Sequence, residues 1–322
     1  MSDPRSLDAL RFFERKQVQQ LFEAYGVDTA QARLIRSNTN LIYSCGNFII
    51  RLTPASVRTK LQIESELAWL IYLGEKGAPV VRLLSGQEVI TIEVEGHKFL
   101  GVIFARIKGR KVEAKDWNGN HFERLGQLSG QLHRLGQEYQ WTGDYGYQHW
   151  NEIPEFHNYP KLDEAFPWGI ELHTAVVSKM MTLPAKAANY GLIHYDIHHG
   201  NYLLLEDGNL VLFDFELCCQ SWYIHDVATV LYYACTHPQS QAFVNFQAHF
   251  LEHFWLGYRM EFPIPSVEEQ AYVPIFLLYR DLMVYGYLLD IWGGKSLTKQ
   301  QEQYLKRMKR SIADRKEIFE HL

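Results

Sequence analysis

The chain has 322 residues, of which 47% are hydrophobic and 21% are charged, and this globular balance excludes a disordered or fibrous protein. Its 32 basic and 37 acidic residues give a net charge of −5, and no run of Lys or Arg is longer than two residues. General nucleic-acid binding usually requires a basic excess or a basic stripe, so we expect no nucleic-acid partner.

Cysteine content and the N-terminus predict the cellular compartment. The four cysteines are sparse, and a disulfide between neighbours in the chain would be strained, so we expect reduced thiols. They are Cys45, Cys218, Cys219 and Cys235. The N-terminal residues MSDPRS lack the basic and apolar pattern of a signal peptide. No apolar stretch approaches the roughly 18 residues of a membrane span. These features predict a soluble cytoplasmic enzyme with no membrane partner.

The first third of the chain is rich in strand signals. Apolar spacing predicts helices over residues 6–24 and 60–74, and Gly46-Asn47 indicates a tight hairpin. The β-prone runs of this region are residues 41–45, 48–52, 80–84, 89–94 and 99–107. The pattern therefore predicts an antiparallel sheet with a helix inserted between its strands.

Beyond Gly109 the pattern becomes mainly helical. Apolar residues recur at helical spacing over residues 121–135 and 241–256. Between them, residues 139–168 form an irregular insert that contains three prolines. The fold class is therefore α+β, with a small antiparallel-sheet lobe over residues 1–105 and a larger helical lobe over residues 106–322.

Residues 191–216 contain the candidate catalytic residues. Apolar runs at 202–205 and 210–213 flank Asp207-Gly208, which predicts a β-hairpin. The polar loop 194–201 enters this hairpin, and an acidic segment leaves it. Because a hairpin brings its two ends together, we expect the loop and the acidic segment to lie close to each other.

The spacing of the polar residues indicates phosphoryl transfer. His194, Asp196 and Asn201 fit the kinase pattern H-x-D-x-x-x-x-N, and Asp214 lies in an apolar-Asp-Phe element after the hairpin. Carboxylates and an amide oxygen suit a hard cation such as Mg²⁺. In phosphoryl transfer a metal neutralises the triphosphate while a carboxylate accepts the hydroxyl proton. The two halves of the pattern together favour a kinase.

At this point the sequence resembles the aminoglycoside phosphotransferase and choline kinase superfamily. The matching stretches are residues 65–70 (SELAWL), 125–133 (LGQLSGQLH), 194–201 (HYDIHHGN), 213–216 (FDFE) and 225–228 (HDVA). The resemblance covers about residues 36–235. It implies a bilobal protein-kinase-like fold with a nucleotide-binding lobe over residues 1–105 and a catalytic and substrate lobe over residues 106–322. It also implies ATP- and Mg²⁺-dependent transfer of phosphate to a hydroxyl group of a small molecule.

Carried over residue by residue, the resemblance implies a role for each polar residue of this segment. Asp196 is expected to be the catalytic base. Asn201 and Asp214 are expected to hold Mg²⁺, with Glu216 as an additional metal ligand. Asp226 is expected to brace the catalytic loop.

The resemblance also implies a nucleotide site. Arg51 is expected to take the place of a phosphate-binding lysine and to pair with Glu66. The other expected contacts are Ser37, Asn38 and Thr39 over the phosphates, and the backbone of Ala105 and Ile107 in the hinge 104–107.

Three departures from the family pattern stand out. Tyr195 replaces the glycine beside the base and is expected to crowd the acceptor site. Arg51 replaces lysine and offers a planar fork instead of a compact ammonium. The loop 37–40 contains no glycine, so its backbone N–H groups and hydroxyls must cap the phosphates.

Several alternatives remain open from the residues alone. His194 and His198 have the spacing of a helical metal-hydrolase site, although the flanking sequence is not helical. Arg51 and Glu66 also fit a surface ion pair. The insert 139–168 holds nine aromatic residues with interleaved acids, which suits either a pocket for an amine or a lid packed by its own rings.

Three functional readings follow. The first is a kinase for a small molecule, with an amino alcohol, an aminoglycoside-like compound or an unassigned metabolite as acceptor. The second is a protein Ser/Thr kinase of the bacterial stress-response type. The third is a catalytically silent nucleotide-binding regulator.

Overall fold

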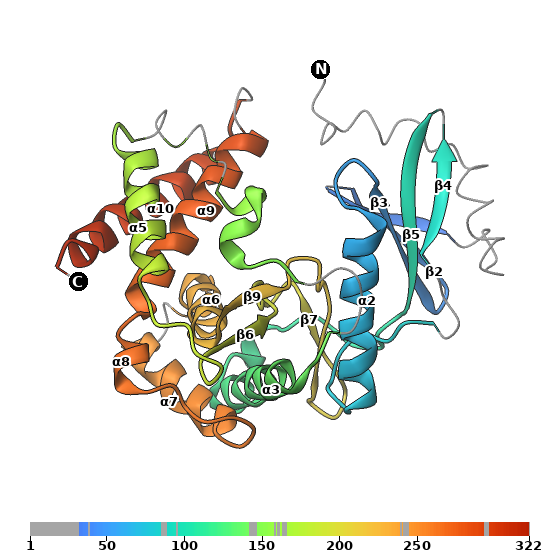
Figure 1. Cartoon of the computed structure of the whole chain (residues 1–322), viewed down its shortest axis with the longest axis horizontal. Helices are drawn as coiled ribbons and strands as arrows, with labels where there is room; N and C mark the ends of the chain where they lie inside the picture. Colours follow the sequence, from blue (N-terminus) through green and yellow to red (C-terminus); the bar gives the residue numbers. More distant parts are fainter. Residues whose placement is uncertain are drawn as a thin grey trace. The chain divides into compact units, whose positions relative to one another are not determined.

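The structure is a computed structural model, and its residues group into two compact units (Figure 1). It describes residues 32–321 apart from 38, 85–88, 95, 142–146, 158, 160–161, 163–165, 239, 241–244 and 293–295. The first unit comprises Met1–Lys111, Gln140–Gly146 and Tyr202–Glu216, and the remaining three segments form the second unit. The helix predicted over residues 6–24 lies outside the described residues.

The first unit contains a five-stranded antiparallel sheet. Its strands are β1 (Arg33–Ser37), β2 (Leu41–Cys45), β3 (Phe48–Pro54), β4 (Ile90–Val94) and β5 (His97–Ala105), in the order β1-β2-β3-β5-β4. Every second side chain of β2 is buried, as expected for a strand with one face on a core. Ile50, Leu52 and Ile103 are completely buried in that core.

Helix α2 (Lys60–Glu75) lies beside this sheet within the first unit (Figure 1). It begins at Thr59, whose side chain accepts a hydrogen bond from the backbone of Gln62 while the Gln62 side chain accepts one from the Thr59 N–H. The inserted helix and the antiparallel sheet are thus confirmed. The predicted strand 80–84 is wrong, because Val80 and Leu83 make only isolated bridges, to Leu212 and Phe104.

The predicted hairpin forms and belongs to the first unit. Strands β7 (Tyr202–Leu204) and β8 (Leu210–Leu212) pair antiparallel. Backbone hydrogen bonds tie β8 to the segment around Val81, with 2.8 Å from the Val81 nitrogen to the Leu212 oxygen. Others tie β7 to Arg110 at 2.8 and 2.9 Å. These bonds explain why residues 202–216 cluster with the sheet instead of with the loop that precedes them.

The second unit is mainly helical. Its longer helices are α3 (Gly119–Glu138), α5 (Gly169–Met181), α6 (Tyr223–Thr236), α7 (Phe246–Tyr258), α9 (Val273–Trp292) and α10 (Lys299–Phe319), with the short α8 (Val267–Gln270). Strands β6 (Tyr190–Ile193) and β9 (Cys219–Trp222) pair antiparallel. None of the described helices is both long and apolar enough to cross a membrane. The α+β class with a helical C-terminal part is confirmed.

Glycines set the contact between α3 and α7. A Cβ added at Gly126 would overlap the backbone of Phe254, and one at Gly257 would overlap the backbone of Glu123. At Gly130 an added Cβ would lie 2.6 Å from the carbonyl oxygen of Tyr258. The glycines of the segment 125–133 therefore allow two helix backbones to touch, which places Tyr258 against α3.

Candidate active site

The predicted catalytic residues divide between the two units. Asp196 and Asn201 lie in the second unit, in the loop that follows β6. The first unit contains Asp214, Glu216 and the predicted nucleotide contacts.

Asp226 braces the catalytic loop, as predicted. This carboxylate, at the first turn of α6, accepts the backbone N–H of His194 at 3.0 Å and that of Tyr195 at 2.7 Å. His133 lies 3.3 Å away through Nε2, and its Nδ1 is 2.7 Å from the Tyr258 hydroxyl. Burial alone would raise the pKa of Asp226, but the hydrogen bonds from His133 and the loop hold it below its usual value. The brace is therefore a buried carboxylate that stays charged.

Tyr195 stands where the resemblance implied a glycine, and its backbone has a conformation that glycine favours. Its φ is 71°, in the left-handed region that glycine enters without strain. The side chain is completely buried and stacks on Phe156 with 4.1 Å between ring centroids, while its hydroxyl lies 2.9 Å from the Met283 sulfur. The expectation that Tyr195 crowds the acceptor site is therefore wrong, because a completely buried ring cannot touch an acceptor.

Asp196 is held by groups on both of its oxygens. Oδ1 accepts a hydrogen bond from the Arg280 guanidinium, and Oδ2 accepts one from Asn201 Nδ2 at 3.0 Å. His198 Nε2 lies 3.4 Å from Oδ2. Burial alone would raise the pKa of Asp196, but Arg280 and His198 hold it well below its usual value. The side chain is an ionised carboxylate that remains 18% exposed.

Asn201 supplies its amide nitrogen to Asp196, including the Asp196 carbonyl oxygen at 3.0 Å. Its own N–H bonds the carbonyl of His198 at 2.8 Å. This orientation leaves the Asn201 side-chain oxygen as the atom that suits a hard cation.

Arg280, on α9, is the site residue that the sequence analysis missed. It is buried, donates to the Tyr233 hydroxyl at 2.9 Å, and lies 5.1 Å from the Tyr233 ring centroid and 5.6 Å from that of Tyr195. Burial alone would lower the pKa of Arg280, but Tyr233 and Asp196 hold it above its usual value. The available signal was Arg280-Asp281, a charged pair inside the otherwise apolar run 273–289.

In the first unit, Arg51 and Glu66 form the predicted pair. Two parallel hydrogen bonds of 2.8 and 2.9 Å join Arg51 to Glu66, and Arg58 adds a third at 2.5 Å. The side chains of Arg51 and Glu66 are 5% and 2% exposed, so this is not a surface ion pair. Burial alone would raise the pKa of Glu66, but the two arginines hold it at about 2.

The acidic element after the hairpin is also oriented within the first unit. Asp214 has a left-handed backbone with φ of 68°, and its Oδ2 lies 3.6 Å from Arg36 Nη1. Glu216 accepts a hydrogen bond of 2.6 Å from the side chain of the buried Asn40. Oxygen donors of this kind fit a hard divalent cation.

The predicted nucleotide contacts are described in part. Ser37 ends β1, Thr39 is half-buried in the loop after it, and Asn38 lies outside the described residues. The Ala105 N–H donates to the Arg82 carbonyl at 2.8 Å, so only its carbonyl oxygen remains for a base. Ile107 is half-buried just beyond the end of β5.

Four of the eight described aromatic rings of the insert 139–168 belong to the core, and the other four are half-buried. Trp150, Phe156, Tyr159 and Phe166 are all buried, and Trp150 packs against Trp222 and Tyr279. Trp141 is half-buried and Tyr145 lies outside the described residues. These buried rings favour a segment packed on the helical unit over an aromatic pocket.

The structure does not support the metal-hydrolase site that the spacing of His194 and His198 left open. His194 and His198 lie in a non-helical loop, and among the described residues they belong to no group of metal-binding side chains. The four cysteines are free, as predicted.

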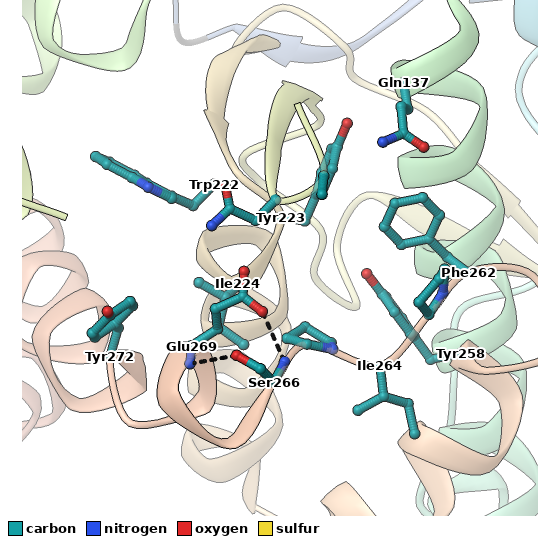
Figure 2. A pocket seen from close by; sticks show the side chains of 14 residues that line it. Gln137, Trp222, Tyr223, Ile224, Tyr258, Phe262, Ile264, Ser266, Glu269 and Tyr272 are labelled. Carbon is teal, nitrogen blue, oxygen red and sulfur yellow. Dashed lines mark hydrogen bonds between the residues drawn. The ribbon is translucent and has the colours of Figure 1, made fainter. Parts of the chain in front are cut away.

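A separate cavity of about 360 Å³ lies in the second unit (Figure 2). Its wall includes Tyr223, Tyr258 and Phe262, and Figure 2 shows Ser266 and Glu269 joined by reciprocal hydrogen bonds of 2.7 and 3.2 Å. None of the predicted site residues lines it. Its lining residue Tyr258 bonds His133, which lies against Asp226 behind the loop 194–201.

Comparisons with known proteins identify the family of this chain. A family model described as the phosphotransferase enzyme family matches residues 16–262. The amicoumacin kinase of Bacillus subtilis (strain 168) is 26% identical over 319 residues, covering 95% of this chain and 94% of that protein. The solved structure of amicoumacin kinase hAmiN, in complex with AMP-PNP, Ca²⁺ and Ami, has a TM-score of 0.83 at 26% identity and covers 93% of this chain and 94% of that chain.

A second solved structure shares the fold at lower identity. It is a microcompartment-associated aminopropanol kinase, with a TM-score of 0.73, 20% identity, and coverage of 92% of this chain and 94% of that chain.

Proposed function

The chain belongs to the phosphotransferase enzyme family and is a small-molecule phosphotransferase, and we propose that it moves the γ-phosphate of ATP to an acceptor hydroxyl with Asp196 as the base. Membership confirms the resemblance to the aminoglycoside phosphotransferase and choline kinase superfamily. The observation that carries the role of Asp196 is its state: ionised, held on both oxygens, and 18% exposed.

Asp196 supports transfer by positioning as well as by basicity. A positioned carboxylate accepts the proton of the attacking hydroxyl as the new bond to phosphorus forms. Arg280 and Asn201 keep the carboxylate from rotating, which holds the acceptor in line. Asp226 fixes the backbone on which Asp196 stands.

Different residues would bind the nucleotide and its metal ion. Mg²⁺ supplies charge neutralisation on the triphosphate, and we propose Asp214, Asn201 and Glu216 as the residues that hold it. Arg51, oriented by Glu66, would contact phosphate oxygens. Ser37, Asn38 and Thr39 would cap the phosphates, and the hinge at Ala105 and Ile107 would contact the adenine. We propose that the first unit binds the nucleotide and the second unit binds the acceptor.

The names of the relatives support a proposal for the acceptor class. Their names identify amicoumacin and aminopropanol as substrates of those proteins. We propose an acceptor of the amino alcohol type, in which a cationic amine accompanies the hydroxyl. The partly exposed anion Asp196 is compatible with such a cation.

The test is ATP turnover measured by coupled ADP release, with amicoumacin, aminopropanol, choline, homoserine and an aminoglycoside as acceptors. We expect turnover with at least one amino alcohol and a loss of at least about 10³-fold in Asp196→Ala. Asp314→Asn, an exposed carboxylate on α10, is the matched control and should retain full activity. Turnover within tenfold of wild type in Asp196→Ala would reject the base assignment.

The panel also separates the alternatives. Stabilisation by ATP without turnover on any small acceptor would identify a silent regulator. Phosphate transfer to protein hydroxyls alone would identify a protein kinase.

A further inference from the structure

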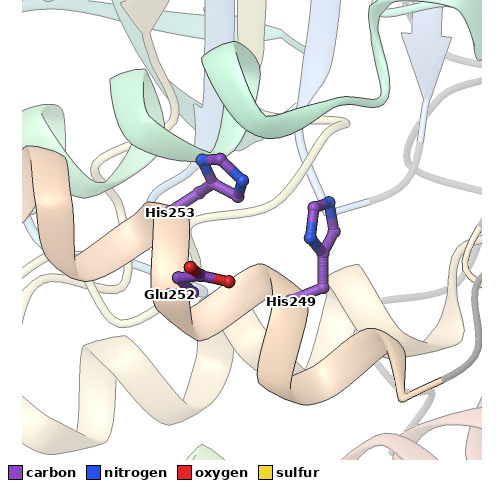
Figure 3. Close-up of side chains that lie close together, drawn as sticks. All are labelled: His249, Glu252 and His253. Carbon is purple, nitrogen blue, oxygen red and sulfur yellow. The ribbon is translucent and has the colours of Figure 1, made fainter.

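Helix α7 carries three metal-binding side chains on one face. His249, Glu252 and His253 are spaced i, i+3 and i+4, which places them over one helical turn. One donor atom from each lies within 4.8 Å of the other two. Figure 3 shows both imidazoles projecting from α7 toward α3, with the Glu252 side chain below the His253 ring in the view.

Helix α3 confines the two rings. The His249 ring lies 6.0 Å from that of Phe122 and 4.8 Å from that of His253. Beside His253, α3 carries Gly119, where an added Cβ would come within 2.5–2.7 Å of three ring atoms. Both histidines are half-buried and Glu252 is exposed, so the donors are held on one side and open to solvent on the other. This confinement reduces the rotamer freedom that metal binding would remove.

From these observations we infer that His249, Glu252 and His253 form a binding site for a divalent transition metal such as Zn²⁺. Two imidazoles and one carboxylate are a zinc donor set that leaves a fourth position for water. Zinc–ligand bonds of about 2.0–2.1 Å place tetrahedral donor atoms about 3.4 Å apart. The donor atoms here lie within 4.8 Å of one another, so side-chain rotations that move each of them by about 1 Å complete the site. Mg²⁺ prefers oxygen donors and is a poor occupant of a site with two imidazoles.

The bound metal joins two consecutive turns of α7 and stabilises that helix. Tyr258, one turn further along, bonds His133, which in turn contacts Asp226. By stabilising α7, the metal raises the thermal stability of the protein. None of the three ligands is hydrogen-bonded or ion-paired to Asp196 among the described contacts, so the metal leaves the basal turnover number unchanged.

The experiment is calorimetric titration of ZnCl₂ into the full chain in excess Mg²⁺, which competes at oxygen-only sites. We expect one zinc ion per wild-type chain. His249→Gln and His253→Gln should each weaken binding by about tenfold or more, and Glu252→Gln by a smaller factor. Because Glu252 is exposed, its variant removes a ligand without disturbing the core. His321→Gln, an exposed histidine near the C-terminus, is the control and should bind as wild type.

A second readout tests the geometry. Zinc at 100 times its Kd should raise the Tm of wild type by about 4–8 °C and leave that of His253→Gln unchanged. Gly119→Ala, which keeps all three ligands but crowds the His253 ring, should also weaken binding. Absence of saturable binding, or equal affinity in wild type and both histidine variants, would overturn the inference.

Discussion

Glu66 in the first unit and Asp196 in the second both accept hydrogen bonds from a buried arginine, yet they differ in what they leave accessible. The Glu66 side chain is 2% exposed, and Arg51 and Arg58 occupy both of its oxygens. Asp196 is 18% exposed, with Arg280 on one oxygen and Asn201 on the other. An arginine can thus keep a carboxylate ionised in either setting, whereas partial exposure decides whether that charge is structural or available to a substrate.

The largest expected effect is a loss of stability in acid that distinguishes the two units. Burial lowers the pKa of His121 and His173 to about 4 and that of His225 to about 3. These groups must stay neutral in the folded second unit, so their contribution is present above pH 6.5 and is lost as pH falls below it. At pH 5 each histidine should remove about 2 kcal/mol of folding free energy.

Glu66 behaves differently over the same range. Its pKa of about 2 means that its contribution persists down to about pH 4.5, its usual value, and is lost only below that. Hydrogen exchange at pH 7 and pH 5, corrected for intrinsic rates, should therefore show protection lost first in the second unit. Equal loss in both units would remove this distinction between them.

Substitution of Glu66 tests whether the buried pair of Glu66 and Arg51 stabilises the fold. Glu66→Gln leaves Arg51 buried without its counterion, and the free energy of unfolding should fall by about 3–5 kcal/mol. Glu64→Gln, on the same helix, breaks an exposed 3.6 Å pair with Lys60 and should change stability by less than about 0.5 kcal/mol. Denaturant titrations of both variants give the measurement. Similar effects from the two substitutions would mean that burial does not set the strength of these pairs.

Substitution of Arg280 tests whether this arginine keeps the partly exposed Asp196 ionised. In Arg280→Met, Asp196 loses the cation that offsets its burial, so its pKa should rise and the acid limb of the kcat profile should move to higher pH. We expect kcat near neutral pH to fall by about tenfold or more, and Arg280→Lys to restore part of it. A similar loss of kcat with an unmoved pH profile would show that Arg280 acts only on packing.

The smallest expected effect concerns Tyr195. Tyr195→Phe removes the hydroxyl that lies near Met283 and Tyr279 and should cost about 1 kcal/mol of stability. Because the ring is completely buried, the KM for the acceptor should not change. A change of more than about threefold in that KM, measured by steady-state kinetics, would place Tyr195 at the acceptor site after all.

The features that the sequence predicted well depend on neighbours in the chain. Helix α2 begins where Thr59 and Gln62 cap each other, and the β2–β3 hairpin turns at Gly46 with φ of 55°. Asp196 and Asn201, the two residues that the motif singled out, lie five residues apart and are joined by a hydrogen bond. In each case the determining contact spans a few residues.

The features that it missed depend on distant contacts. Arg280 lies 84 residues from Asp196, and nothing local indicates that it reaches the catalytic loop. The direction of Tyr195 is set by Phe156 and Met283, which lie on other elements. Strand β1 escaped prediction because most of its side chains are exposed and show no alternation. Residues 80–84 have the composition of a strand, but they pair only through single bridges.

The two backbone amides that point at Asp226 have a spectroscopic consequence. Both N–H groups are buried and donate to a charged carboxylate, at 3.0 and 2.7 Å. Protons in such bonds are strongly deshielded and exchange with solvent only when the surrounding structure opens. The amide resonances of His194 and Tyr195 should therefore lie at the low-field edge of a proton–nitrogen correlation spectrum. They form a pair of intrinsic reporters that reveal, without any added label, whether a ligand or substitution has loosened the backbone under Asp196.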